Sequence, residues 1–501
     1  MDQADQAMTC SINKFILHAI ILSCFLNADI GHNNVVYEGK AGNIPLRVFV
    51  QLPGVVPGLA DISIKIFADG VNKVTIQPQK QDKDRKSKSP PPDIADPVQG
   101  ETNLFSAQLW LMDFGSYNLD IKIYKGQSVE RTSIPVNSIA TKVAVMNQAT
   151  SSVLWVLLGV LFFGGINIIR VGYKVSTEPP GTEPGQTKRK RSYIVTVITL
   201  LFFSAIIYGG KNWWDKIDLA YQQNIFQSFE NKVDILNNGQ ADHISIEIVD
   251  ELWVQGRIAD LIPDHGKIMH MYIISDTYEQ LAHIHPTRTD DKNVFTAKMP
   301  PFKNGTYHLF MDITHETGFS HTMTNTFTYN IEETIYDTTI LNVERDPDDS
   351  WMLNAIEDRI TWKRNQPAYN AGDDIALQFK VTNNGTAAVL EPYINMGGHA
   401  ALLKKDRSVF VHLHPIGTIS MASQEMFQEN YTQDVLDQKD ICFFGFADDS
   451  TGNYFNSNTS PNGEVNFPAI KIGTPGNYAI WVQVKSAGEV ITQKFDFEVT
   501  L

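Results

Sequence analysis

Short segments with an aliphatic side chain at every second position recur along the chain. Near the N-terminus they lie at 46–50, 62–66 and 117–123. Such alternation is typical of strands that bury one face. Two further segments, 152–169 and 192–210, carry no charge, and each is long enough for a transmembrane helix. The pattern therefore predicts a mainly β protein with a two-helix transmembrane hairpin.

A Gly-x-Tyr motif opens one alternating strand in each of three parts of the chain, at Gly115, Gly305 and Gly476. A Phe-x-Ala triplet precedes each of these glycines by nine or ten residues. A Gly turn that leads a Tyr into a late strand is typical of antiparallel sandwiches of the immunoglobulin type. We therefore predict three immunoglobulin-like β-sandwich domains that are copies of one unit.

The hydropathy pattern and the repeats together divide the chain. In order, we predict a signal peptide or N-terminal anchor at 1–28, an extracytoplasmic β-sandwich at 29–146, a transmembrane helix at 150–172, a cytoplasmic basic loop at 173–191, a transmembrane helix at 192–210, a neck at 211–237, an extracytoplasmic His/Met-rich β-sandwich at 238–330, a linker at 331–366, and an extracytoplasmic β-sandwich at 367–501 with a polar insertion at 416–464. The insertion begins beside a His-x-His-Pro motif, a position from which it can cover that motif.

A concentrated basic loop joins the two predicted helices. It contains Arg170, Lys174 and the Lys-Arg-Lys-Arg run at 188–191. By the positive-inside rule this loop is cytoplasmic, and Trp155 and Trp213 lie near the opposite ends of the helices, where interfacial aromatic residues are common. We therefore expect a bacterial inner (cytoplasmic) membrane protein whose large soluble parts are both on the periplasmic or extracellular side.

Composition narrows the possible partners. The net charge of −15 argues against a nucleic-acid partner. The three cysteines, Cys10, Cys24 and Cys442, are too few for a disulfide framework or a cysteine-based zinc site. Cys24 follows Ile-Leu-Ser, which resembles a lipoprotein cleavage box, so either signal cleavage or a lipid anchor fits the N-terminal segment.

One histidine pattern occurs twice, once in each of the last two predicted sandwiches. The two copies are His270 followed after thirteen residues by His283-Ile284-His285-Pro286, and His399 followed after thirteen residues by His412-Leu413-His414-Pro415. The residues between read as a β-hairpin. If His270 lies opposite His283 or His285, all three imidazoles share one face of the hairpin. A register shifted by one residue turns His270 to the other face. Three convergent imidazoles form a metal-binding arrangement.

Four further residues are candidate ligands. His265, Met269 and Met271 flank His270, and Met396 precedes His399 by three residues. Imidazole suits zinc and copper(II), whereas thioether sulfur selects copper(I). This mixture favours copper over zinc. We therefore predict a copper-binding or zinc-binding protein that sequesters, senses or delivers the metal, with the membrane and another envelope metal-handling protein as partners.

Two other functions remain open. A structural or interaction module of the envelope would use the histidines as hydrogen-bonding groups. A metal-dependent hydrolase would need a general base beside the metal, and no Asp or Glu occurs at a matching offset in both copies, so an enzyme is the less favoured interpretation. In the first unit Ile62 stands thirteen residues before Thr75-Ile76-Gln77-Pro78, as if the same hairpin occurred there without histidines.

The segment from Asp264 to His270, with the His-x-His-Pro that follows, resembles the YtkA-like group of extracytoplasmic immunoglobulin-like domains. The chain is also similar to uncharacterised bacterial membrane proteins that carry paired H-x12-H-x-H-P motifs. The resemblance covers about 210–330 and 370–501. It implies a β-sandwich fold and a part in envelope metal handling, chiefly of copper. Gly397-Gly398 stands before His399 in place of the Pro of the family pattern, and Met269 replaces another apolar residue.

Overall fold

The computed structural model describes residues 34–80, 89–179, 181–336, 343–354, 359–364, 366–428 and 462–501. The predicted signal peptide or anchor, all three cysteines and most of the predicted insertion lie outside these residues. The chain divides into two compact units, one with residues up to 139 and from 227 onward, and the other with residues 140–226. Strands predominate over helices, which confirms the mainly β fold.

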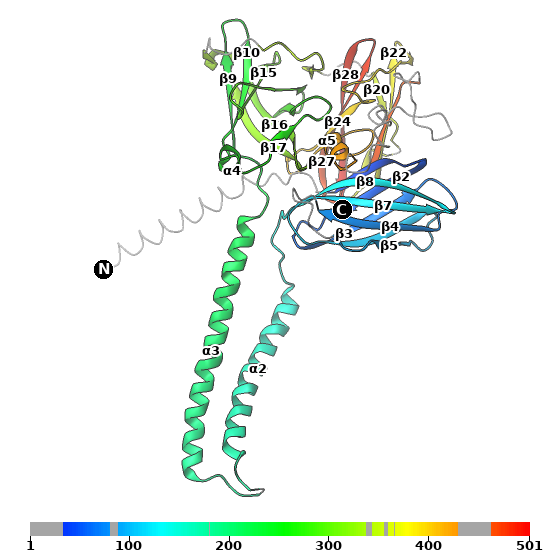
Figure 1. Ribbon diagram of the computed structural model, residues 1–501. Coiled ribbons are helices and arrows are strands. Elements are labelled where there is room, and N and C mark those ends of the chain that lie inside the picture. Colours follow the sequence, from blue (N-terminus) through cyan, green and yellow to red (C-terminus); the bar gives the residue numbers. More distant parts are fainter. Residues whose placement is uncertain are drawn as a thin grey trace. The chain divides into compact units, whose positions relative to one another are not determined.

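The first strand group consists of β1 to β8 (Figure 1, blue to cyan). Its strands are β1 (Val35–Ala41), β2 (Ile44–Gln51), β3 (Gly58–Ile66), β4 (Lys73–Lys80), β5 (Asp93–Pro97), β6 (Leu104–Leu111), β7 (Gly115–Lys125) and β8 (Ser128–Ser138). They pair in the order β1-β2-β3-β6-β5-β4-β7-β8. Aliphatic residues from both ends of this order, such as Val48 and Ile121, meet in one buried core, so the sheet folds over on itself.

The second strand group has two sheets. Its elements are β9 (Asn231–Asn237), β10 (Asp242–Ile248), α4 (Glu251–Val254), β11 (Leu261–Ile262), β12 (His270–Ser275), β13 (Leu281–Ile284), β14 (Thr287–Arg288), β15 (Val294–Lys298), β16 (Gly305–His315), β17 (Ser320–Tyr329), the 3-10 helix η1 (Ile331–Glu333), β18 (Ile335–Tyr336) and β19 (Ser350–Met352). One sheet has the order β14-β15-β10-β9-β18, and the other has β11-β16-β12-β13-β19 with β17 beside β16. Ile246 and Met311, one from each sheet, share a core. After Pro286 the chain leaves β13 in one sheet and enters β14 in the other.

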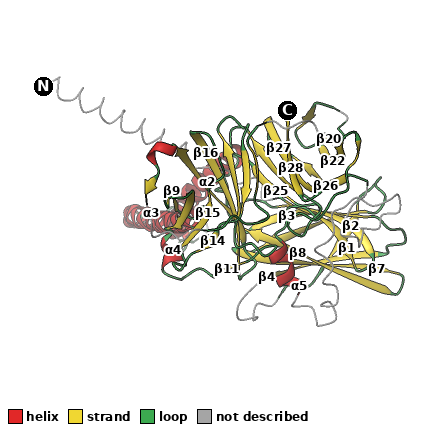
Figure 2. Ribbon diagram, turned by 90° about the horizontal axis from the view of Figure 1, so that it is seen from above, coloured by secondary structure: helices red, strands yellow, loops and turns green. Residues whose placement is uncertain are grey.

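The third strand group follows the same plan (Figure 2). Its elements are β20 (Ile360–Trp362), β21 (Ala368–Asn370), β22 (Asp374–Asn383), β23 (Thr386–Ala387), β24 (His399–Lys404), β25 (Phe410–Leu413), α5 (Met421–Gln428), β26 (Glu464–Lys471), β27 (Gly476–Ser486) and β28 (Glu489–Thr500). β22 pairs with β20, β23 and β26, and the second sheet has the order β21-β28-β27-β24-β25. Phe379 and Ile480 come from different sheets and lie in one core.

Strands that begin with Gly-x-Tyr occupy equivalent places in all three groups. β7, β16 and β27 each pair with the next strand along the chain and, on the other edge, with β4, β12 and β24. Seven residues after the Gly, the pairs are Lys122 with Thr75, Asp312 with His270, and Gln483 with His399. The repeated motif therefore marks a repeated sheet register.

The histidine-free match expected in the first group was wrong in its alignment. Ile62 lies on β3 and Thr75 on β4, and β4 pairs with β5 and β7 instead of with β3. The hairpin equivalent to β12–β13 is β4–β5, in which Thr75 pairs with Ile94. A thirteen-residue step alone did not identify this hairpin because the β4–β5 loop is longer than its counterparts.

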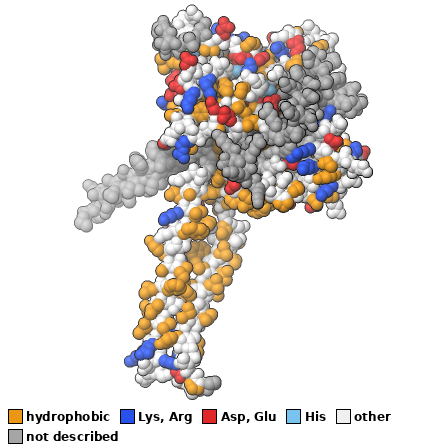
Figure 3. Space-filling view, in the orientation of Figure 1, with side chains coloured by type: hydrophobic (Ala, Val, Ile, Leu, Met, Phe, Trp, Pro, Cys, Tyr) orange, Lys and Arg blue, Asp and Glu red, His pale blue; other side chains and the backbone are white. Residues whose placement is uncertain are grey.

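Two helices, α2 (Gln148–Val175) and α3 (Gln186–Gln223), make up the second compact unit. Both are long and apolar enough to cross a membrane, with mean hydropathy of 2.2 and 2.0 in their most apolar windows. Apolar side chains cover their surfaces (Figure 3). Gly165 lies against the Phe203 ring, where a Cβ would be 2.7 Å from a ring carbon, so this glycine permits close helix packing.

The element boundaries differ from those predicted at three places. α3 begins at Gln186, inside the range predicted as a cytoplasmic loop. α3 continues into the range predicted as a neck, and β9 already begins there, at Asn231. The range predicted as a linker, 331–366, contains η1, β18, β19 and β20. β19 completes a sheet of the second group by pairing with β13, so this range contributes directly to the fold around the histidines.

A histidine cluster between two strand groups

The β12–β13 hairpin places its three histidines on one face. Tyr272 pairs with His283 and Met271 with Ile284, a register that puts His285 opposite His270. This is one of the two registers expected from the sequence to bring the imidazoles together. Met271 and Ile273 point into the core of the second group. Because side chains alternate along a strand, His270 and Tyr272 point out of that core.

The β24–β25 hairpin has the same register. Ala401 pairs with His412 and Ala400 with Leu413, so His414 lies opposite His399. Ala400 and Leu413 are in the core of the third group, which leaves the histidines on its outer face. Both histidine faces are therefore outer faces of sheets and need a cover if they are to be buried.

The two outer faces cover each other. Apolar residues of both hairpins and of β16 and β27 form a separate buried cluster between the two groups. Within it the rings of Phe310 and Phe410 are stacked with centroids 4.3 Å apart. Trp481 is also fully buried there. Burial of large aromatic rings contributes strongly to the stability of such an interface.

This packing merges the two predicted patches into one cluster of seven imidazoles. Its members are His265, His270, His283, His285, His399, His412 and His414. Ring centroids from different strand groups lie close together, for example 5.8 Å for His283 and His399 and 5.3 Å for His265 and His414. Five of the seven histidines are buried, for example His270 at 2% and His399 at 0% exposed, and His265 and His412 are half-buried.

The middle histidine of each hairpin reaches across to the other group. The Nδ1 atom of His283 lies 3.0 Å from Oε1 of Gln483, and Nδ1 of His412 lies 3.0 Å from Oδ2 of Asp312. Asp312 and Gln483 occupy the same position in their Gly-x-Tyr strands. The interface is therefore approximately two-fold symmetric, with an acidic residue on one side and an amide on the other.

Hydrogen bonds fix the tautomers of His270, His283 and His285. Nε2 of His270 donates to the backbone carbonyl of Asp264 over 3.1 Å. In the amide orientation of this structure, the Gln483 NH2 group donates to the hydroxyls of Ser350 and Thr492, and its Oε1 accepts the proton on His283 Nδ1.

His285 follows the same rule. Its Nδ1 donates to Oδ1 of Asp349 over 3.0 Å, and its Nε2 has no hydrogen-bond partner among the described residues. The lone pairs of this triad are therefore on Nδ1 of His270 and on Nε2 of His283 and His285. One nitrogen of each ring lies within 4.8 Å of the other two, and Nδ1 of His270 is 3.3 Å from Nε2 of His283. Two facing lone pairs repel unless a cation lies between them.

Burial keeps these imidazoles neutral. Removal from water lowers the pKa of His270, and it lowers the pKa values of His283 and His285 well below the usual range. Burial also raises the pKa of Asp349 to about 7 and that of Asp312 to about 6. Neutral imidazole whose other nitrogen donates to a carboxylate or carbonyl is the usual form of a metal-binding histidine.

A second triad consists of His265, His399 and His414, each with a nitrogen within 4.8 Å of the others. This differs from the expected set, because His265 stands where His412 was predicted. His412 belongs to neither triad, and its Nδ1 contacts Asp312. His265 is held there by a tight turn in which it and Gly266 both have positive φ, 50° and 80°.

The predicted methionine ligands lie elsewhere. Met269 and Met271 are fully buried in the core of the second group. Met396 packs against Ile416 and Met421 in a small apolar cluster. A third group of possible ligands, His285 with Asp346 and Asp349, is partly occupied by an ammonium group, because Nζ of Lys267 contacts Asp346 over 2.6 Å.

The start of the predicted insertion lies beside the cluster. Gly417 forms a bridge with His414 and another with Tyr37 of the first strand group. The backbone N–H of Ala422, on α5, donates to Oδ1 of Asp264. The described part of the insertion, 416–428, therefore connects the first strand group to the histidine cluster.

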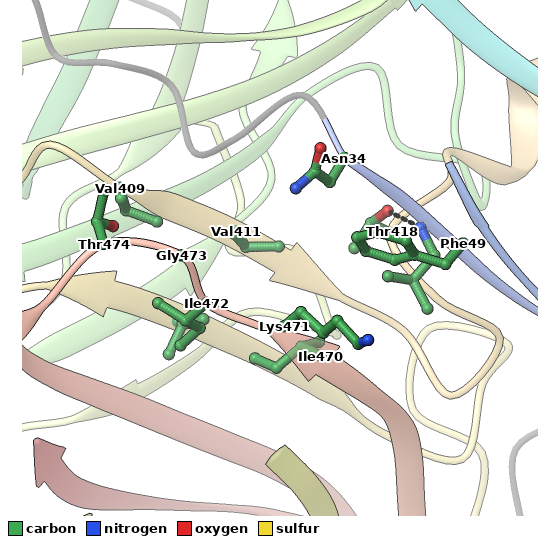
Figure 4. Close-up of a pocket in the computed structure, with 12 residues that line it drawn as sticks. Asn34, Phe49, Val409, Val411, Thr418, Ile470, Lys471, Ile472, Gly473 and Thr474 are labelled. Atoms are coloured by element: carbon green, nitrogen blue, oxygen red, sulfur yellow. Dashed lines mark hydrogen bonds between the residues drawn. The ribbon is translucent and has the colours of Figure 1, made fainter. Parts of the chain in front are cut away.

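A small cavity of about 50 Å³ lies between the first and third groups (Figure 4). Its lining includes Phe49, Val411 and Thr418 and contains none of the histidines. It is apolar and too small for an organic ligand, so the histidine cluster is the better candidate site.

Three polar residues of the site were missed from the sequence. Asp312 and Gln483 carry a usable signal, since both lie seven residues after the Gly of Gly-x-Tyr. Asp349 lies in the range predicted as a linker and has no such signal.

Comparisons with known proteins give a family but no activity. Solved structures similar to the chain include a tetra-tandem repeat in the extending region of a large adhesion protein (6% identity, 94% of this chain and 93% of that chain, TM-score 0.15). Others are the chicken CNTN1 FN1–FN3 domains (6%, 90% and 97%, 0.15) and the ICAM-5 D1–D4 ectodomain fragment (8%, 92% and 83%, 0.15). TM-scores this low support no inference about the chain.

No curated protein matches the sequence. The model of one family, described as a domain of unknown function (DUF8832), matches residues 228–333 and 355–500. These ranges cover half of the chain, and they contain both histidine hairpins. The chain is therefore a member of the DUF8832 family.

Proposed function

We propose that this protein is a membrane-anchored metal-binding protein of the bacterial envelope, and that His270, His283 and His285 hold a transition-metal ion. The observation that carries the proposal is the fixed protonation of this triad. Each ring uses one nitrogen to donate to Asp264, Gln483 or Asp349, and the remaining lone pairs converge. An arrangement of three neutral imidazoles with hydrogen-bonded outer partners is suited to zinc or copper.

Copper is the metal we favour. Copper(I) is less favoured than the sequence suggested, because the thioethers of Met269 and Met271 lie in the core of the second strand group. For copper(II) the argument rests on the donor set, since an all-imidazole site binds copper(II) more tightly than zinc in the usual order of divalent metals. Zinc is the main competitor for the site.

The place of the metal follows from the chain's charge pattern. The basic residues at the helix ends next to the connection, such as Lys174 near the end of α2 and Arg189 in the first turn of α3, favour a cytoplasmic position for the connection. The strand groups before and after the helices would then both be extracytoplasmic, as three immunoglobulin-like sandwiches similar to YtkA-like domains. A buried site there suits sequestration, sensing or delivery of metal to another envelope protein.

His308 illustrates the competing structural role. It lies at the same interface, but both of its ring nitrogens have partners: Nδ1 contacts Thr326, and Nε2 contacts Asp276 and Arg407. Histidines of a purely structural module would be expected to look like this. By contrast, His265, His285, His399 and His414 each retain a ring nitrogen without a hydrogen-bond partner among the described residues, which favours metal binding. The remaining nitrogens of His270 and His283 face each other over 3.3 Å.

The test is a metal titration of the full-length protein in detergent after removal of bound metal. Copper(II) and zinc(II) are titrated against a competing chromophoric chelator. We expect tight binding that is lost in the double variant His283→Ala plus His285→Ala and kept in His308→Ala, with circular dichroism to check folding. The proposal fails if neither metal binds tightly, or if the double variant binds as wild type does.

A further inference from the structure

The cluster contains four histidines outside the first triad, and one of them, His412, contacts Asp312. His265 comes from the turn before β12, and His399 and His414 come from the β24–β25 hairpin. His399 and His414 are buried, and the side chain of His265 is 1% exposed. Both ring nitrogens of His399 and of His414 lack a hydrogen-bond partner among the described residues. A buried imidazole N–H without an acceptor costs free energy, and such groups are rare in folded proteins.

We propose that His265, His399 and His414 form a second metal site, so that the cluster is a two-ion centre built across the interface of the second and third strand groups. The inference rests on the proposed function. One nitrogen from each ring lies within 4.8 Å of the others, and no residue belongs to both triads. A cation bound here would give buried ring lone pairs the partner that the protein does not supply.

The two sites are neighbours. The ring of His399 lies 5.8 Å from that of His283, and the ring of His265 lies 6.2 Å from that of His270. Two divalent ions at such short separation repel each other. The cluster contains a group that offsets this repulsion, because the Asp264 carboxylate lies 3.8 Å from Nε2 of His265.

Outer hydrogen bonds distinguish the two sites. All three rings of the first triad are oriented by acceptors, whereas His399 and His414 are oriented by packing alone. Loss of outer partners usually weakens metal binding by about 10–100-fold. The second site therefore takes the same class of ion, a divalent copper or zinc, more weakly. It is the site that loads last and releases first.

The second site also joins the two strand groups. Its ligands come from both groups, whereas all three ligands of the first site come from one hairpin. Release of the second ion therefore removes a direct link across the interface and leaves the first ion in place. This arrangement suits a centre that stores one ion and exchanges another.

The experiment is a measurement of stoichiometry on the full-length protein in detergent. The metal-free protein is loaded with copper(II), unbound metal is removed by gel filtration, and the copper to protein ratio is measured by mass spectrometry. We expect two equivalents for wild type and one for His399→Ala plus His414→Ala. His412→Ala is the matched control, since it removes a half-buried histidine that belongs to neither triad, and it should retain two.

A second variant keeps the test independent of folding defects. His265 has φ of 50°, a conformation that Asn tolerates, so His265→Asn removes the imidazole and preserves the turn. It should weaken the second binding step at least tenfold and leave the first step unchanged. Electron paramagnetic resonance of the doubly loaded wild type should show coupled copper(II) spins, and this coupling should disappear in His265→Asn.

The outcomes separate the two proposals. One equivalent in wild type, or two unchanged equivalents in His399→Ala plus His414→Ala, overturns the second site and leaves the proposed function standing. If neither copper nor zinc binds, both proposals are overturned. Two equivalents whose spins are uncoupled overturn the two-ion centre, because the second ion then lies elsewhere.

Discussion

The β4–β5 and β12–β13 hairpins share a register but differ in the side chains that could bind a metal and in the exposure of those side chains. Thr75, Pro92 and Ile94 occupy the positions that His270, His283 and His285 occupy in the second group. Ile94 is 58% exposed, whereas His285 is 3% exposed. The fold therefore forms without the histidines and without a covering hairpin.

Histidines and a covering strand group occur together. The hairpins with histidines are the hairpins that another strand group covers, through Phe310 and Phe410 among others. The position seven residues after the Gly of Gly-x-Tyr also changes with them. It is Lys122 in the first group, whose charge repels a cation, and Asp312 and Gln483 in the others, which accept hydrogen bonds from histidine.

Metal removal should have the largest effect. It should lower the hydrogen-exchange protection of the hairpins with histidines and leave that of the β4–β5 hairpin unchanged. A ligand that binds only the folded state stabilises it by about 2.7 kcal/mol at a free concentration of 100 times Kd. Hydrogen exchange of the full-length protein with copper and with a chelator should therefore show added protection in β12, β13, β24 and β25. Equal protection of β4 and β5 would mean that the ion binds elsewhere or stabilises the chain non-specifically.

Removal of a residue that accepts a hydrogen bond from a triad histidine should have the next largest effect, on copper affinity. Gln483→Leu leaves the Nδ1 proton of His283 without its acceptor, so the tautomer that places the lone pair on Nε2 is no longer fixed. We expect copper affinity to fall by about 10–100-fold. Asp276→Asn is the control, since it changes an acceptor of His308 outside both triads. If both variants weaken copper binding equally, the loss in Gln483→Leu does not come from the hydrogen bond to His283.

Much of the first triad could be predicted because it depends on local sequence. A thirteen-residue step with His-x-His is compatible with few hairpin registers, and in the observed one His270 lies opposite His285. The strand alternation and the apolar helices are local properties in the same way. The second triad was not predictable in full. Its third member, His265, lies in a turn, and the predicted member, His412, contacts Asp312 instead.

The merging of the two patches depends on contacts between parts of the chain far apart in sequence. Tyr272 and Phe410 face each other because two outer sheet faces pack together, and hydrophobic periodicity does not specify which outer faces meet. Asp349 was missed for a related reason. It approaches His285 only because β19 adds to the sheet beside β13, within a range whose composition resembles a linker.

Acid should destabilise the last strand of the second group more than the last strand of the first group. This effect should be smaller than the two effects above. Burial lowers the pKa of His321 to about 3, while the equivalent position on β8 is Glu130. The pKa of unfolded His is about 6.5, so the unfolded state binds the proton first and stability falls as pH drops below that value. At pH 5 the loss is about 2 kcal/mol, at roughly 1.4 kcal/mol per pH unit.

Hydrogen exchange of β16 and β17 against β7 and β8, corrected for intrinsic rates, measures this difference. His321→Leu should reduce the pH dependence of β17, because this variant lacks the imidazole with the pKa of about 3, while the buried His315 on β16 remains. An unchanged pH dependence in this variant would assign the acid sensitivity to other groups.

Transfer of the histidines to the first hairpin should have the smallest effect. The triple variant Thr75→His, Pro92→His, Ile94→His reproduces the spacing on the equivalent register, in a chain whose own triad is disabled by His283→Ala plus His285→Ala. We expect only weak copper binding, because position 94 is exposed and the Lys122 side chain, opposite position 75, offers no acceptor. A competitive chelator titration measures it.

The additional substitution Lys122→Gln tests whether the three grafted histidines are sufficient for tight copper binding or whether burial is also needed. It supplies at position 122 the amide that Gln483 supplies in the third group, and it should raise the affinity of the grafted site without reaching that of wild type. Affinity equal to wild type would show that three histidines on the right register are sufficient and that the covering interface is dispensable. Weak binding with Lys122→Gln still present assigns the remaining affinity to burial between the two strand groups.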